Sequence, residues 1–165
     1  MQTQVRSFFL KDDGEIPNNP DLPVIVYEGV FNDGLSIEET SARHNWKNSW
    51  TGDVFDYHHY HSNTHEVLGV KNGRATILVG GDAGERVELK NGDVVVLPAG
   101  TGHKKVESSE DFEVVGAYPG GSSYNMRERD PAARAQALAE IQNVPLPEMD
   151  PVYGDSGPLI EKWKK

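Results

Sequence analysis

The sequence has no cysteine, no long apolar run and fewer basic than acidic residues. Without cysteine the protein can form no disulfide, no cysteine-based zinc finger and no thiol nucleophile, and its redox compartment stays open. No run approaches the roughly 18 apolar residues that a membrane span requires. The N-terminal segment Met1–Leu10 also lacks the long apolar core of a signal peptide. We therefore expect a cytoplasmic protein with no membrane partner.

The charge balance is acidic. Lys and Arg number 16 against 26 Asp and Glu, which gives a formal net charge of −10 with histidine neutral. Nucleic-acid binding needs a basic footprint, so we expect no nucleic-acid partner. A chain of 165 residues, 36% hydrophobic and 25% charged, is typical of one globular domain with a substantial core.

Between Phe55 and Tyr118 the sequence contains a series of short apolar stretches separated by turn sequences. The turn sequences are Asn72-Gly73, Gly80–Gly84, Asn91-Gly92 and Pro98–Gly100. Several short strands at this spacing, with turn chemistry between them, indicate an all-β sandwich or barrel. Val94–Leu97 is apolar at every position, which predicts a strand that is covered on both faces.

The N-terminal flank predicts one strand and one helix. The strand is Leu22–Tyr27, bounded by turn signals. Ser36–Glu39 is a capping box, because the Ser36 hydroxyl can accept a hydrogen bond from the backbone N–H of Glu39. A helix should follow and reach about His44 or Trp46.

The C-terminal flank predicts a helix followed by an arm. Asp130 and then Pro131 form an N-cap and a first helical position, and Ala132–Ile141 is rich in helix-forming residues. Several prolines after this segment cannot continue a helix. We expect the remaining chain to lie as an arm over the barrel or over a neighbouring subunit.

Histidine is concentrated in one short segment, at His58, His59, His61 and His65, with Glu66 directly after it. A strand puts residues i and i+2 on one face, so His59 and His61 can reach one ion. Glu66 follows a polar bend, and His103 follows a Pro-Ala-Gly turn that can return it from a distant strand. A single histidine on a strand is more often hydrogen-bonded than a ligand, but imidazoles and a carboxylate together are transition-metal ligands. The four residues predict a metal site, and the other two histidines of the segment should point away from it.

Alternation along the strands also places candidate catalytic residues beside the metal. Phe55 and Tyr57 share a face with His59, although a place in the barrel core is the alternative for both. Lys105 shares a face with His103, and an inward lysine needs a partner. It would bind a substrate carboxylate or pair with a barrel glutamate, unless the strand twists it out to solvent. Tyr118 closes the last strand, so the predicted catalytic residues are Tyr57, Lys105 and Tyr118. Packing or interface positions are expected for Trp46, Trp50 and Trp163.

Two motifs in this region resemble those of the cupin family. The first cupin motif, G-x5-H-x-H-x3,4-E-x6-G, matches His59, His61, Glu66 and Gly73. The second, G-x5-P-x-G-x2-H-x3-N, matches Gly92, Pro98, Gly100 and His103. Two departures occur, because Gly52 stands one residue too far from the first histidine and Glu107 replaces the closing asparagine. Neither falls on a ligand position, so the resemblance implies the same four metal ligands.

The sequence further resembles the YjlB-like subgroup of single-domain bacterial cupins, through the segments Asp12–Pro20, His58–Ser62, His65–Val70 and Asp150–Gly154. It implies an RmlC-like double-stranded β-helix, or jelly-roll barrel, in one domain of residues 1–165. We expect the core barrel at about 53–120, a strand and helix extension at 1–52, and a C-terminal helix and arm at 121–165. The resemblance further implies a divalent transition metal (Fe, Mn, Ni, Co or Zn) and a homodimer.

Three neutral imidazoles and one carboxylate would leave a divalent ion with a net charge near +1 and about two open coordination positions, as in catalytic sites. Such an ion polarises a bound carbonyl or lowers the pKa of bound water, and iron adds chemistry with O₂. The ligands do not identify the metal, because affinity order alone would favour copper or zinc at most such sites.

Three functions are compatible with this site. The first is a metal-dependent enzyme, a dioxygenase, isomerase or decarboxylase, that acts on a small polar molecule. The second is a non-catalytic protein that binds or senses a small ligand through the metal. The third is a structural barrel whose histidines hold no metal.

Overall fold

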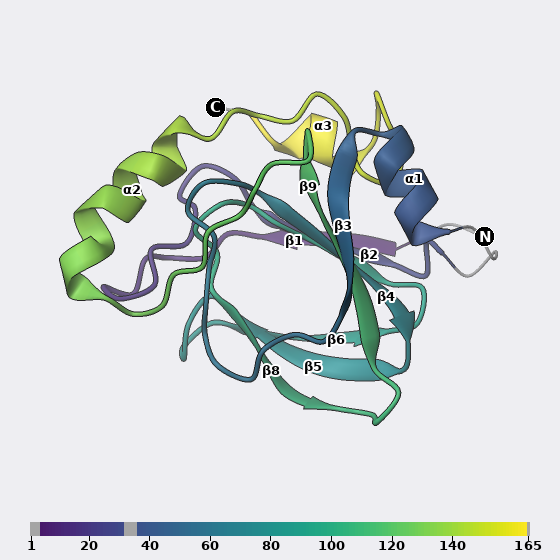
Figure 1. Cartoon of the computed structure of the whole chain (residues 1–165), viewed down its shortest axis with the longest axis horizontal. Coiled ribbons are helices and arrows are strands. Elements are labelled where there is room, and N and C mark those ends of the chain that lie inside the picture. Colours follow the sequence, from purple (N-terminus) through teal and green to yellow (C-terminus); the bar gives the residue numbers. More distant parts are fainter. Residues whose placement is uncertain (1–3, 32–35, 165) are drawn as a thin grey trace.

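The computed structural model describes residues 4–31 and 36–164. In these residues the chain forms nine strands, three α-helices and one 3₁₀-helix, with the helices on one side of a barrel (Figure 1). The strands are β1 Gln4–Phe8, β2 Val24–Glu28, β3 Trp46–Gly52, β4 Glu66–Asn72, β5 Arg74–Val79, β6 Glu85–Lys90, β7 Val94–Leu97, β8 His103–Ser108 and β9 Glu113–Pro119. The helices are α1 Ile37–Arg43, the 3₁₀-helix Pro131–Ala133, α2 Arg134–Asn143 and α3 Pro158–Lys162.

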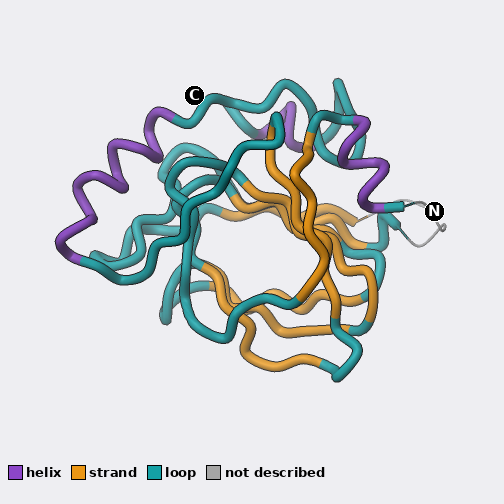
Figure 2. The backbone as a smooth tube through the Cα atoms, viewed as in Figure 1, coloured by secondary structure: helices purple, strands orange, loops and turns teal. Residues whose placement is uncertain are grey.

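The strands form two antiparallel sheets. The larger has the order β1-β2-β7-β4-β9-β3 and the smaller the order β6-β5-β8. Strands far apart in the sequence are neighbours in the larger sheet, as when β4 pairs with both β7 and β9. Figure 2 shows the two sets of strands facing each other across the interior. The predicted all-β jelly-roll architecture is confirmed.

The space between the sheets is filled by aliphatic side chains from both. Leu68, Val95 and Val114 come from the larger sheet, and Ile77 and Val87 from the smaller. Each is at most 1% exposed, and burial of apolar surface contributes about 25 cal/mol per Å². This core fixes the distance between the sheets and therefore the width of the barrel.

A second core covers the outer face of the larger sheet. Strand alternation turns Val67 and Val96 to this face, where they pack with Tyr27 and with Leu159 and Trp163 of the C-terminal segment. The expectation that Val94–Leu97 is covered on both faces is confirmed, since all four residues are buried. The arm therefore lies over this chain's own barrel, anchored by the Trp163 indole N–H, which donates to the Pro23 carbonyl at 2.9 Å.

The predicted helices are present with small shifts in their ends. The Ser36 hydroxyl accepts from the Glu39 N–H at 3.1 Å, as the capping box requires. Helix α1 stops at Arg43 because Asn45 adopts a left-handed φ of +63° and turns the chain into β3. The predicted C-terminal helix begins as a 3₁₀ turn and becomes α-helical only at Arg134.

The segment before residue 53 contributes more to the barrel than the sequence pattern indicates. Its three strands, β1, β2 and β3, are all members of the larger sheet. Helix α3 was not expected, because prolines break helices, but Pro158 stands at a first helical turn where no N–H is needed. Of the helices in residues 4–31 and 36–164, none has the length and apolarity to cross a bilayer.

Candidate metal centre

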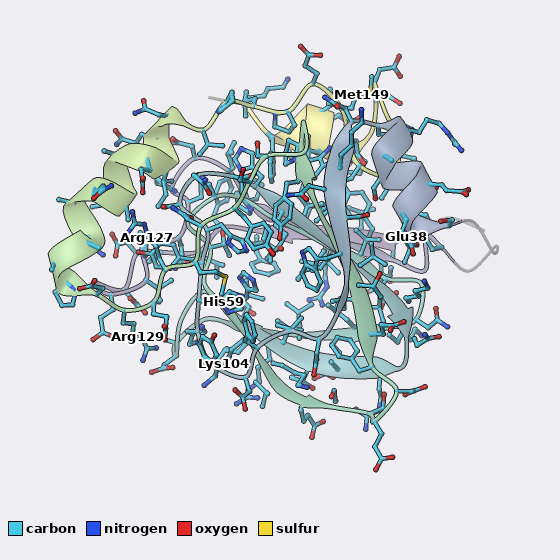
Figure 3. All side chains as sticks on the ribbon, viewed as in Figure 1. Glu38, His59, Lys104, Arg127, Arg129 and Met149 are labelled. Atoms are coloured by element: carbon cyan, nitrogen blue, oxygen red, sulfur yellow. The ribbon has the colours of Figure 1, made fainter. Side chains whose placement is uncertain are left out.

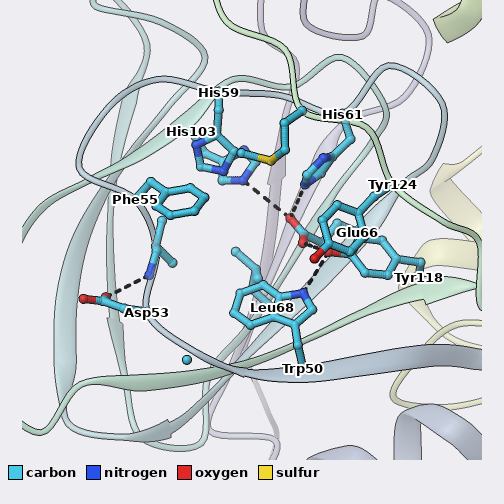
Figure 4. Close-up of a pocket in the computed structure, with 13 residues that line it drawn as sticks. Trp50, Asp53, Phe55, His59, His61, Glu66, Leu68, His103, Tyr118 and Tyr124 are labelled. Atoms are coloured by element: carbon cyan, nitrogen blue, oxygen red, sulfur yellow. Dashed lines mark hydrogen bonds and ion pairs between the residues drawn. The ribbon is translucent and has the colours of Figure 1, made fainter.

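Three histidines from two distant segments meet inside the barrel (Figure 4). His59 and His61 precede β4, and His103 is the first residue of β8. Reciprocal backbone hydrogen bonds join the segments, since the N–H of His103 donates to His59 at 3.0 Å and the reverse bond measures 3.3 Å. One ring nitrogen of each histidine lies within 4.8 Å of the other two, and all three side chains are buried. The structure thus brings together the three histidines that the sequence singled out.

Each of these rings is fixed by a backbone carbonyl on the side away from the cluster. Nδ1 of His59 lies 3.1 Å from the carbonyl oxygen of Tyr57, and Nδ1 of His103 lies 3.0 Å from that of Thr101. Nδ1 of His61 lies against the carbonyl oxygen of Asn125. A carbonyl only accepts, so each Nδ1 donates and each Nε2 keeps a free lone pair. Such contacts orient the histidine ligands of metal sites and set their tautomer.

Glu66, the first residue of β4, adjoins two of the three rings. Its Oε1 atom lies 3.3 Å from Nε2 of His61 and 3.4 Å from Nε2 of His103. Neither contact has hydrogen-bond geometry, and Oε1 is buried without a hydrogen-bond partner. Its Oε2 atom accepts from the Tyr118 hydroxyl at 2.7 Å, and that hydroxyl accepts from the Trp50 indole at 2.8 Å.

Several buried acceptors therefore converge with no protein donor between them. An unsatisfied buried acceptor is rare and destabilising unless something else satisfies it. A divalent cation fits this set, because imidazole nitrogens and a carboxylate oxygen are its usual ligands. The donor chemistry agrees with the metal that the sequence predicts, and the metal's identity stays open.

The charges of the cluster support the same conclusion. Burial and the adjacent His103 lower the pKa of His59 to about 3, so its ring is neutral near pH 7. Burial also acts to lower the pKa of His61, but the Glu66 carboxylate outweighs burial and raises that pKa above its usual value. Burial would raise the pKa of Glu66, yet His61 and His103 together hold it well below the ordinary range. The carboxylate is therefore ionised near pH 7 and supplies the negative charge that a cation bound here would meet.

A cavity of about 220 Å³ opens beside the cluster. The four candidate ligands form one part of its wall. The rest is mainly apolar and aromatic, and includes Trp50, Val54, Phe55, Leu68, Tyr118, Tyr124 and Met126. Figure 4 shows Leu68 and Trp50 on the side of the cavity opposite the histidines, and Phe55 beside His103 and His59.

The three predicted catalytic residues take different places. Tyr118 lines the cavity and is fully buried, with its hydroxyl on Glu66. Tyr57 does not line the cavity; it is 41% exposed and stacks on Phe55 at a ring distance of 5.1 Å. The reason is that the 53–58 segment is not a regular strand, so alternation does not carry Tyr57 inward.

Lys105 also lies outside the cavity wall. Its ammonium pairs at 2.6 Å with the Asp53 carboxylate, which does line the cavity. Its partner is this aspartate rather than a barrel glutamate, and the hydrogen bond between them is exposed. The catalytic roles of these residues stay predictions.

Four residues of the site had no signal in the sequence reasoning. Trp50 was expected to be a packing residue, and Tyr124 and Met126 stand in a segment without a recognisable pattern. Asn125, between them, provides the carbonyl that fixes His61. The segment is brought there by a backbone bridge between Tyr60 and Arg127, a pairing that no local periodicity encodes.

The two remaining histidines of the cluster-bearing segment do not join the metal cluster. His65 is 1% exposed, and its Nδ1 accepts from the Ala99 N–H at 2.9 Å. His58 is buried with Nε2 3.6 Å from the Asp82 carboxylate. The sequence placed both outside the metal site, and the structure adds that both are buried rather than solvent-facing.

Comparison with known proteins identifies the family to which this fold belongs. A family model described as "Cupin domain" matches residues 49–115. The Bacillus subtilis (strain 168) protein called "Uncharacterized protein YjlB" is 48% identical over 165 residues, which is 100% of both chains. An acireductone dioxygenase structure from Bacillus anthracis, with a cadmium ion in its active centre, is 22% identical with a TM-score of 0.38 over 56% of this chain and 60% of that one. Procruciferin, an 11S globulin from Brassica napus, is 16% identical with a TM-score of 0.39 over 86% and 34%.

The antiparallel barrel and its buried histidine cluster define a cupin barrel. The chain belongs to the cupin family and, within it, to the YjlB-like proteins. The two solved structures are distant, and this chain spans 60% of one and 34% of the other. They carry no argument about this chain's reaction.

Proposed function

We propose that the protein is a metal-dependent enzyme that binds a divalent transition metal through His59, His61, Glu66 and His103 and transforms a small molecule beside it. The observation that carries the proposal is the cluster of three oriented imidazoles, two of which lie 3.3 and 3.4 Å from the buried, unpaired Oε1 of Glu66. A structural ion is enclosed by protein ligands, whereas this cluster faces a cavity.

Each residue has a defined task in this proposal. The histidines present neutral nitrogens because backbone carbonyls hold their other nitrogens. Glu66 remains ionised and supplies the one negative charge, and Tyr118 acts as a positioning residue that holds the second carboxylate oxygen. A metal bound here would polarise an oxygen of the substrate or lower the pKa of bound water. The proposed reactions are those of a dioxygenase, an isomerase or a decarboxylase.

A second candidate is a protein that binds or senses a small ligand without turnover. One observation favours it: the hydroxyl of Tyr118 is held by Glu66, and the Asp53 carboxylate is held by Lys105. General acid–base catalysis needs a group that is free to exchange a proton with the substrate. Turnover by the metal-loaded protein separates the two candidates.

The test of the metal site is metal content. The protein is purified without a tag or chelator, and bound metal is measured by mass spectrometry beside His59→Ala and His103→Ala. We expect about one metal per wild-type chain and almost none in the variants. His44→Ala, at a histidine outside the cluster, is the control and should keep its metal. Equal, near-zero metal in all of these proteins would overturn the proposal.

Oxygen uptake tests the enzyme class. The iron-loaded protein is assayed with a panel of small carboxylates and thiols, beside His59→Ala. Uptake in wild type alone supports a dioxygenase, whereas substrate binding without any turnover supports the second candidate. Formation of a homodimer and a cytoplasmic location stay predictions.

A further inference from the structure

The wall of the cavity beyond the candidate ligands is built from rings and aliphatic groups. Trp50, Phe55, Tyr124 and Met126 come from three separate segments and meet there with Leu68 of β4. The rings are packed against one another and against the ligands, since Phe55 lies edge-on to His59 at 5.3 Å and Tyr124 stacks on Tyr118 at 4.6 Å. A wall of this kind binds apolar or aromatic surface and offers little to a polar molecule.

The polar groups on this wall are largely occupied by other protein groups. The Trp50 N–H is donated to Tyr118, and the Tyr118 hydroxyl is donated to Glu66. Asp53 accepts from the Lys105 ammonium and from the backbone N–H of Val54. A sugar or another polyol would lose its hydrogen bonds to water here and find few replacements, which is unfavourable for each group buried.

The charges on the cavity wall also argue against ligands that carry several carboxylates. Among the described residues no lysine or arginine lines the cavity, while two carboxylates do. A ligand with several carboxylates would therefore meet no cation except the metal itself. A divalent ion with three neutral imidazoles and one carboxylate carries a net charge near +1, which matches one negative oxygen group.

The volume of the cavity limits the size of the ligand. An apolar cavity of about 150 Å³ is sufficient to hold benzene. The cavity here measures about 220 Å³, which fits one six-membered ring with a short polar substituent. A fused or two-ring molecule would need the mouth of the cavity to open.

We propose that the substrate is a largely apolar single-ring molecule with one chelating oxygen group, singly charged when bound to the metal. This inference rests on the proposed metal-dependent function and changes its expectation of a small polar molecule: the ligand is polar at one end only. Phe55 and Trp50 are then specificity-determining residues, because they belong to the apolar wall against which the ring would pack.

The experiment uses two probes with the same chelating group. Benzohydroxamic acid carries a phenyl ring, and acetohydroxamic acid carries only a methyl group in its place. Binding to the zinc-loaded protein is measured by calorimetry for the wild type, for Phe55→Ala and for Phe9→Ala. Phe55 is 50% exposed and Phe9 63% exposed, so neither variant removes a core residue, and Phe9 does not line the cavity.

We expect benzohydroxamic acid to bind wild type about 10- to 100-fold more tightly than acetohydroxamic acid, because the cavity buries the ring. Phe55→Ala should remove most of that ratio without changing the affinity for acetohydroxamic acid, and Phe9→Ala should leave both unchanged. Equal affinity of the two probes for wild type, or an undiminished ratio in Phe55→Ala, would overturn the inference while the metal site stands. Failure of the protein to retain zinc, or failure of zinc to affect the binding of either probe, would instead overturn the proposed function.

Discussion

The molecule contains two buried polar networks that use the same kinds of side chains. One lies between the larger sheet and the C-terminal arm and is named here the arm network: Tyr27 and Asp150, joined by a hydrogen bond, with the ring pair of His65 and Trp163. The other is the metal cluster of His59, His61, Glu66 and His103. Both contain imidazole and a carboxylate that is at most 2% exposed, and a tyrosine hydroxyl donates to that carboxylate in each case, from Tyr27 to Asp150 and from Tyr118 to Glu66.

The networks differ in how their acceptors are satisfied. In the arm network Asp150 accepts from the Tyr27 hydroxyl at 2.8 Å and from three backbone N–H groups. In the metal cluster Oε1 of Glu66 has no hydrogen-bond partner, although Nε2 of His61 and Nε2 of His103 lie 3.3 and 3.4 Å from it. Composition and burial are alike, so it is the unpaired acceptors that distinguish a site prepared for a ligand from a structural network.

The largest expected effect comes from breaking the arm network. Asp150→Ala leaves one hydroxyl and three backbone N–H donors without their acceptor, in a residue that is 0% exposed. We expect the free energy of unfolding to fall by about 3–5 kcal/mol, measured by urea denaturation. Tyr27→Phe, which removes one of the four donors, should lose only about 1 kcal/mol. A loss of less than about 1 kcal/mol in Asp150→Ala would show that the arm network contributes little to stability.

Stabilisation by bound metal should depend on the metal cluster and not on the arm network. Zinc at 100 times its dissociation constant should raise the free energy of unfolding of wild type by about 2.7 kcal/mol, because it binds the folded state alone. His103→Ala should lose this increment, whereas Asp150→Ala should keep it despite a less stable fold. An increment in His103→Ala equal to that of wild type would place the zinc elsewhere.

The sequence predicts the metal cluster better than the cavity around it. His59 and His61 follow strand alternation, and the Pro-Ala-Gly turn before His103 returns that residue to them. Such local rules also predicted α1, α2 and the doubly covered strand Val94–Leu97. They succeed because each depends on neighbouring residues alone.

The rest of the site depends on contacts between distant segments. Tyr57 was placed by alternation in a stretch that is not a strand, so its position outside the wall could not be foreseen. Trp50 enters through the pairing of β3 with β9, which has an irregular register between Lys47 and Trp50. Tyr124 belongs to a segment held by its pairing with Tyr60, beyond the reach of any local pattern.

A smaller effect on metal affinity is expected when Tyr118 is changed, because it holds Glu66 in place without being a proposed ligand. Tyr118→Phe removes the donor on Oε2, so the carboxylate loses its fixed orientation. We expect metal affinity to fall about 10- to 100-fold, the usual effect of removing a partner of a metal ligand. Competition with a chromophoric chelator measures it. Tyr124→Phe is the matched control, because its ring stacks on Tyr118 while no hydrogen bond joins its hydroxyl to Glu66. Unchanged affinity in Tyr118→Phe would leave that tyrosine a packing residue.

The smallest expected effect for a single step, here one pH unit, is the pH dependence of the metal-free protein that arises from His59. Its pKa of about 3 in the folded state lies below the ordinary value near 6.5, so between these values the unfolded chain binds more protons. The free energy of unfolding should therefore fall as pH decreases through this window, by at most about 1.4 kcal/mol per pH unit from this residue. His61 acts in the opposite direction, since its raised pKa contributes stability that is present at low pH and lost as pH rises through the folded pKa. Denaturation in chelator at several pH values, for wild type and His59→Asn, isolates the His59 contribution as the difference between the two slopes. The arm network is the same in wild type and in His59→Asn, so it cancels in this difference. Identical slopes of unfolding free energy against pH would show that the His59 ring is not held neutral by burial.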